Sequence, residues 1–174
     1  MNYSEQKLLA MPMPVEEVKQ MLTEGYPVWP SVWYKLLAQL TPETVKSLVE
    51  LALEKSVWIP QDVFIYLMQH QGELQPRGLF VFKKDKFDLI TMLKQYREQH
   101  PDEPWSEAFQ LEAVKQPNYK DFLMRLQIYP PEAVQLELIK RADLVDIINN
   151  WPWEELEFTS EAQVDLMSGT FDKI

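Results

Sequence analysis

Few side chains in this chain belong to the types that carry catalysis. The two histidines stand apart, with His70 at the end of a predicted helix and His100 directly before Pro101. Asp62 lies eight positions before His70, so the sequence has neither an i, i+4 ligand pair at this place nor an H-E-x-x-H motif. A cation is favoured at the negative pole of a helix. We therefore predict capping or surface roles for both histidines.

Thiol, nucleotide and serine chemistry also lack their motifs. The chain has no cysteine, which excludes disulfides, thiol nucleophiles and zinc–thiolate sites. Its four glycines form no phosphate-binding loop, and no G-x-S-x-G turn is present. Many carboxylates fall in the first turns of predicted helices, where the helix dipole favours an acid: Glu16, Glu17, Glu43, Asp62, Glu107 and Glu132. We predict no enzyme activity, no cofactor and no metal site.

Aromatic side chains are the better candidates for a functional surface. Trp33 and Tyr34 are neighbours in a predicted helix, as are Phe64 and Tyr66 in the next, so one of each pair is expected in the core and the other in solvent. Exposed Trp and Tyr make good interface anchors. The segment NNWPWEELEF adds a second candidate surface. The predicted partner-binding residues are Trp33, Tyr34, Tyr66, Trp151, Trp153, Glu154 and Glu155.

Charge bears on the class of partner. The net charge is −10, from 27 acidic and 17 basic residues, and half of it lies in residues 151–174. This charge opposes nucleic-acid phosphates and anionic lipids, so direct binding to nucleic acid or membrane is not expected. The stretch LFVFKKDKF mixes aromatic and basic residues, yet it is better explained by core phenylalanines with solvated lysines. A basic protein partner fits the charge, and so does imitation of DNA.

Helical patterns cover most of the chain and must position these residues. In TPETVKSLVELALEKS the apolar residues follow helical spacing, with Thr41 as N-cap, Pro42 in the first turn and Glu43 beside the dipole. The residues 78–84, rich in β-formers, are predicted to be an ordered loop that crosses the core. The predicted helices are 14–24, 30–40, 42–55, 60–71, 85–99, 104–116, 119–128, 131–149 and 152–157.

An internal repeat links the first two predicted helix pairs. Proline, a helix with Val-Lys, a turn, Val-Trp, proline and an aromatic helix recur with a period of roughly 28–30 residues, as in α-solenoid proteins, although the tetratricopeptide pattern does not align. The repeat pairs Val28-Trp29 with Val57-Trp58, and a weaker echo begins at Pro131. We interpret Trp29 and Trp58 as structural pins at the bends, where proline forces the chain to turn. A cage for a cationic or planar ligand is the alternative.

Together these patterns predict an all-α fold, either a bundle or a short solenoid-like array of helical hairpins in the N-terminal half. The expected division is a helical domain over residues 1–150 and an acidic segment over 151–174. The first residues lack the features of a secretory signal, and no apolar run is long enough to span a bilayer, so a cytoplasmic location is predicted. The predicted function is a non-enzymatic protein-interaction module. An acidic inhibitor that mimics DNA is the alternative, and an enzyme that uses carboxylates is a third hypothesis.

Overall fold

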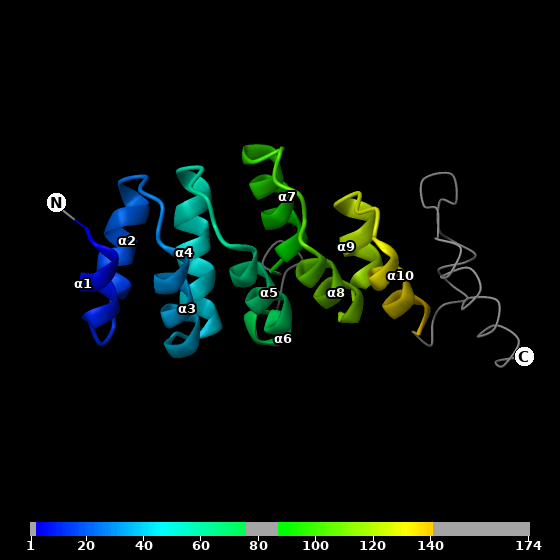
Figure 1. The fold of residues 1–174 in the computed structure, drawn as a ribbon, viewed down its shortest axis with the longest axis horizontal. Coiled ribbons are helices and arrows are strands. Elements are labelled where there is room, and N and C mark those ends of the chain that lie inside the picture. The colour runs from blue at the N-terminus through cyan, green and yellow to red at the C-terminus, as the bar shows by residue number, and fades with distance from the viewer. Residues whose placement is uncertain (1–2, 76–86, 141–174) are drawn as a thin grey trace, which may run out of the picture. The chain divides into compact units, whose positions relative to one another are not determined.

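The computed structural model describes residues 3–75 and 87–140, and Figure 1 shows their arrangement. These ranges contain ten α-helices and no β-strand, which confirms the all-α prediction. The chain divides into two compact units, residues 1–104 and 105–174. The predicted boundary between residues 150 and 151 lies outside the described residues and stays a prediction.

The described part of the first unit holds seven helices, and most of them contact the helix two places further along the chain. Helix α1 packs against α3, α2 against α4, α3 against α5, α4 against α6, and α5 against α7, while α4 also contacts α5. The bounds are α1 Glu5–Ala10, α2 Val15–Thr23, α3 Pro30–Gln39, α4 Pro42–Glu54, α5 Gln61–Gln69, α6 Gln71–Leu74 and α7 Leu89–Gln99.

The described part of the second unit contains α8 (Glu107–Lys115), α9 (Tyr119–Arg125) and α10 (Glu132–Ile139). Helix α8 packs against both others. Trp105 stacks on Phe109 with ring centroids 4.5 Å apart.

Helix α4 shows why the sequence forms these elements. The Thr41 side chain accepts a hydrogen bond from the Thr44 N–H at 3.4 Å. Pro42 occupies the first position of the helix, where a backbone N–H would have no partner within the helix, so proline loses no hydrogen bond. The predicted apolar stripe is buried: Val45, Leu48, Val49, Ala52 and Leu53. The sequence-based prediction for this helix is confirmed.

Several helix boundaries differ from the predictions: α8 begins at Glu107 rather than at residue 104, and α9 ends at Arg125 rather than at residue 128. Helix α1 was not predicted, because Leu8 is its single buried residue and so short a helix shows no apolar period. The helix predicted from residue 85 begins at Leu89, where the Asp88 carboxylate accepts from the Ile90 N–H at 3.1 Å and caps it. Helix α10 is described as far as Ile139. The remainder of the predicted helix 131–149, the helix 152–157 and the loop 78–84 lie outside the described residues.

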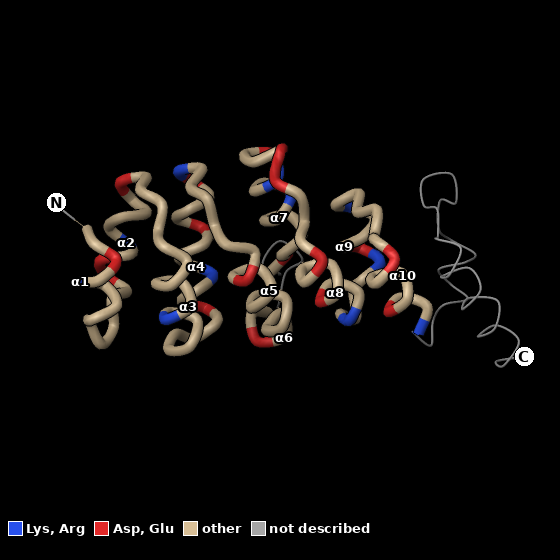
Figure 2. The backbone as a smooth tube through the Cα atoms, viewed as in Figure 1, with Lys and Arg blue, Asp and Glu red and all other residues tan. Residues whose placement is uncertain are grey.

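Charged residues of both signs are spread over the described helices (Figure 2). Lys46 illustrates the pattern, since its Nζ lies 3.7 Å from Glu43 Oε1 and 3.8 Å from Glu50 Oε1 on the same helix. Exposed pairs of this kind contribute at most a few tenths of a kcal/mol each, roughly 0.3–0.5. The acidic excess therefore does not form a continuous single-sign stripe on α4.

Three turns between helices share one backbone design. Gly25, Ser56 and Gln127 have positive φ angles of 83°, 54° and 52°. The next N–H in each turn donates to the carbonyl five residues back, at 2.9 Å in all three turns. This bond and the left-handed residue define a Schellman ending, which satisfies carbonyls at the end of a helix.

The shared turns correct the alignment of the internal repeat. In all three, the N-cap of the next helix comes four residues after the left-handed residue: Trp29, Pro60 and Pro131. Counted from the turn, Trp29 therefore corresponds to Pro60, and Trp58 corresponds to Pro27. The predicted pairing of Trp29 with Trp58 is therefore wrong. Pro30 follows Gly25 by five residues, whereas Pro60 follows Ser56 by four, so the two tryptophans fall at different positions after their turns.

Candidate functional site: an aromatic pocket

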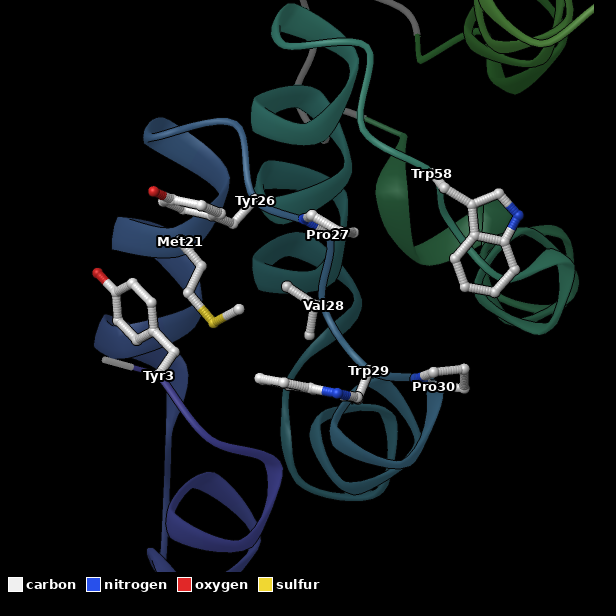
Figure 3. A pocket seen from close by; sticks show the side chains of 8 residues that line it. All are labelled: Tyr3, Met21, Tyr26, Pro27, Val28, Trp29, Pro30 and Trp58. Atoms are coloured by element: carbon white, nitrogen blue, oxygen red, sulfur yellow. The ribbon is translucent and has the colours of Figure 1, made fainter. Parts of the chain in front are cut away.

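An open pocket of about 620 Å³ lies in the first unit beside the α2–α3 turn (Figure 3). Its volume falls within the range of ligand-binding pockets, roughly 300–1,000 Å³. The residues that line it come from the N-terminal segment, α2, the α2–α3 turn and the α4–α5 turn: Tyr3, Met21, Tyr26, Pro27, Val28, Trp29, Pro30 and Trp58.

The extended segment between α2 and α3 forms the middle of the pocket. Gly25 ends α2 with a φ of 83°, and Pro30 starts α3, so the residues between them cannot join either helix. Trp29 takes an extended conformation with ψ at 141°, as expected before a proline. Val28 is 2% exposed and anchors the segment to the core. Its neighbours are left to face outward, and Tyr26 is 53% exposed.

Two further aromatic residues extend the pocket on either side of that segment. In Figure 3, Tyr3 lies on the side of Tyr26, whereas Trp58 lies on the side of Pro30. The Tyr3 and Tyr26 ring centroids are 6.2 Å apart with the rings tilted by 58°. Trp58 is 39% exposed, although Val57 and Ile59 on both sides of it are buried. The alternation of an extended chain thus turns Trp58 out of the core.

The electrostatic character of the pocket is weakly negative. Its eight lining residues include no charged side chain, and aromatic faces carry a negative partial charge. At the rim, the Tyr3 hydroxyl donates to Glu24 Oε2 at 3.4 Å, and Gln20 Nε2 donates to Glu24 Oε1 at 3.3 Å. Partial desolvation, followed by the charge of Glu24, raises the pKa of Tyr3. Its hydroxyl therefore stays a donor at neutral pH.

Trp29 and Trp58 differ from their predicted roles. Both were interpreted as structural pins at the bends, with a ligand cage as the alternative; Trp29 is half-buried, Trp58 is exposed, and both line the pocket. The prediction relied on their recurrence at equivalent positions, which the turn geometry contradicts. For Trp29 a signal was available in YPVWP, because prolines three residues apart exclude a helix and leave the intervening Trp29 ring beside an extended chain.

Trp33 was predicted to be a partner-binding surface residue, and this prediction is wrong. Its side chain is 0% exposed, and among the described residues its indole Nε1 has no hydrogen-bond partner. Val32 beside it is also fully buried, so this side of α3 belongs to the core. A Trp at this place stabilises the fold and cannot contact a partner directly.

The other predicted anchors in the described range do not line the pocket. Tyr34 is 49% exposed, and its hydroxyl donates to Asp62 Oδ2 at 2.8 Å, a hydrogen bond that raises the pKa of Tyr34. Tyr66 is half-buried, and its hydroxyl donates to the Leu40 carbonyl at 3.3 Å. The remaining predicted residues lie outside the described ranges: Trp151, Trp153, Glu154 and Glu155.

A buried polar cluster around Tyr96 is the second place where titratable groups meet. The Tyr96 hydroxyl lies 2.5 Å from Glu103 Oε2 and 3.1 Å from the Ile59 carbonyl oxygen. Gln61 Nε2 donates to Glu103 Oε1 at 3.4 Å and to the Pro104 carbonyl at 2.7 Å. Burial and then the Glu103 hydrogen bond raise the pKa of Tyr96 strongly. This hydroxyl is a structural link between two loops.

Both histidines lie at helix ends, where the sequence analysis placed His70. His70 caps α5, with its Nδ1 at 2.9 Å from Glu73 Oε1. His100 caps α7 and stacks on Tyr96 with ring centroids 4.5 Å apart. In residues 3–75 and 87–140, no three His, Asp or Glu side chains are grouped to hold a metal ion. Within the same ranges, every helix is too short or too polar to cross a membrane.

The site is thus an open, uncharged pocket whose walls are aromatic rings and prolines, with one carboxylate at its rim. Comparison of the chain with family models, with curated proteins and with solved structures finds no match.

Proposed function

We propose that this chain is a protein-interaction module that binds an extended segment of a partner protein in the aromatic pocket. The observation that carries the proposal is the gathering of four aromatic rings and two prolines around a hollow that the core leaves open. Tyr26 and Trp58 together expose large ring surfaces that would otherwise be expected inside a fold. Trp and Tyr with one face open are the residues that dominate binding energy at protein interfaces.

The scaffold supports the same function. Contacts between α1 and α3, α3 and α5, α2 and α4, and α4 and α6 are those of stacked helical hairpins. We propose on this basis that the first unit is a short solenoid-like array. Such arrays present the turns and faces of successive hairpins to a partner chain, and the pocket is built mainly from the α2–α3 and α4–α5 turns.

The acidic-inhibitor alternative depends on a surface of one sign. On the described helices, acids are interspersed with lysines, as in the i, i+3 pairs of Glu16 with Lys19 and of Glu137 with Lys140. Mixed charge of this kind favours the aromatic pocket over charge imitation as the binding surface of this part of the chain.

Photo-crosslinking in the native host tests the function. Tyr26 is replaced by a photoreactive benzoyl-phenylalanine, and a second protein carries the same group at Tyr34, which is similarly exposed but lies outside the pocket. We expect a discrete protein adduct from position 26 that position 34 does not form and that Trp58→Ala removes. Equal adducts from both positions would refute a pocket-centred function.

Ionic strength separates the proposal from the alternative. Binding of the purified partner is measured as the salt concentration rises from about 0.05 M to about 0.5 M. Over this range the Debye screening length shortens from roughly 14 Å to roughly 4 Å. An aromatic pocket loses little affinity over this range, whereas a DNA mimic loses its target steeply. A steep loss that Trp58→Ala does not alter would favour the DNA mimic.

A further inference from the structure

The shape of the pocket selects among partner segments. Its apolar surface consists mainly of flat rings and rigid pyrrolidines, and Met21 and Val28 are the two aliphatic side chains among the lining residues. Flat, rigid surfaces lose little entropy on binding and match ligands that are themselves rigid. A polyproline II segment is such a ligand, because proline fixes its backbone before binding. Grooves lined with aromatic residues are a recurring solution for binding such segments.

The hydrogen-bonding groups of the pocket match the same ligand. The indole N–H groups of Trp29 and Trp58 and the Tyr26 hydroxyl have no hydrogen-bond partner among the described residues. A polyproline II segment has no internal hydrogen bonds, so its carbonyl oxygens are free to accept. These three donors are thus free to bond with acceptors on such a ligand.

Charge adds a requirement for a cation. The pocket is lined by no Lys or Arg side chain, whereas Glu24 is held at its rim by the Tyr3 hydroxyl and by Gln20. Glu24 is exposed and can pair with a basic side chain of a ligand. The whole chain carries a net charge of −10, which attracts a basic segment at longer range.

Building on the proposed function, we infer that the partner segment is a proline-containing peptide in polyproline II conformation that carries an arginine or lysine. Its pyrrolidine rings pack against Trp29 and Trp58, its carbonyls accept from the indole N–H groups, and its cation pairs with Glu24 at the rim. This occupant satisfies the shape, the hydrogen-bonding groups and the charge of the pocket together.

Selection from a random dodecapeptide library displayed on phage tests this inference, with the full chain as target. For the wild type we expect enriched peptides that contain two or more prolines and at least one basic residue. Trp58→Ala removes the enrichment, and Glu24→Gln keeps the prolines but loses the preference for a basic residue. Tyr34→Ala, exposed outside the pocket, selects the same peptides as the wild type.

A synthetic copy of one enriched peptide then gives the magnitudes by tryptophan fluorescence titration. Trp58→Ala weakens binding about tenfold or more, as expected for an anchor. Glu24→Gln weakens it about two- to fivefold, the size of an exposed charge pair. Replacing the prolines of the peptide by alanine weakens binding by at least about tenfold, because an unconstrained chain must be ordered on binding. Circular dichroism of each variant confirms that it is folded.

The outcomes separate this inference from the proposed function. The enriched peptides could depend on Trp58 but lack proline, for example helices with apolar residues at i and i+4. That outcome overturns the polyproline inference but still supports the pocket as a peptide-binding site. Enrichment that Trp58→Ala and Glu24→Gln leave unchanged places the binding elsewhere and overturns both. The absence of any enriched peptide also overturns both.

Discussion

Replacing Trp33 by alanine separates its structural role from the role of Trp58. The Trp33 side chain is fully buried, and an indole buries about 200 Å². At about 25 cal/mol per Å² this burial contributes about 5 kcal/mol. The indole N–H is buried without a partner among the described residues, and removing it relieves a penalty of about 2 kcal/mol. We therefore expect Trp33→Ala to lower the free energy of unfolding of the first unit by about 3 kcal/mol.

Urea denaturation followed by circular dichroism measures this loss. With a slope of about 2 kcal/mol per M, a loss of about 3 kcal/mol lowers the midpoint of the transition of the first unit by about 1.5 M. Trp58→Ala is the matched control, because its ring is 39% exposed and loses less contact. We expect its loss to stay below about 1.5 kcal/mol. Equal midpoints for the two variants would refute this assignment of core and pocket.

Three further predictions concern the turns, a cap and the buried tyrosine. Gly25→Ala lowers the free energy of unfolding by about 1 kcal/mol, because alanine is strained at a φ of 83° even though its Cβ would meet no neighbour. Ser56→Gly, at a φ of 54°, is neutral or slightly stabilising in the same urea assay. Thr41→Ala removes the N-cap of α4 and costs about 1 kcal/mol, measured as a lower thermal midpoint. Burial and the Glu103 hydrogen bond raise the pKa of Tyr96 in the folded protein, so folding favours the protonated hydroxyl. The stability that this preference contributes is complete below the pKa of about 10 in the unfolded chain and is lost as the pH rises above that value. The free energy of unfolding of the wild type, measured by urea denaturation, therefore falls more steeply between about pH 10 and 11 than that of Tyr96→Phe. An equal fall for the two proteins would contradict this explanation.

Local sequence signals predict the helices well because a helix start depends on adjacent residues. Thr41 and Pro42 begin α4 as predicted, and the Val45 stripe is buried. By contrast, α7 begins several residues later than predicted, because the Asp88 carboxylate accepts from two N–H groups of the first turn and sets the start of the helix there. In α1, the contact with α3 is not visible in its own apolar pattern, and the N-cap Ser4 with Glu5 in the first turn is the local sign of a helix in the sequence.

Sequence patterns were enough to predict the helical class, the turns at glycine and proline, and the presence of aromatic residues beside those turns. Which of these rings lie in the core and which at the surface follows from the packing of the helices. Trp33 and Trp58 each follow a valine near a proline, yet one is 0% and the other 39% exposed. The physical reason is that burial depends on the helices that cover a side chain, and these contacts join residues far apart in the chain. The pocket could not be predicted for the same reason, because it brings Tyr3 and Trp58 to one extended segment.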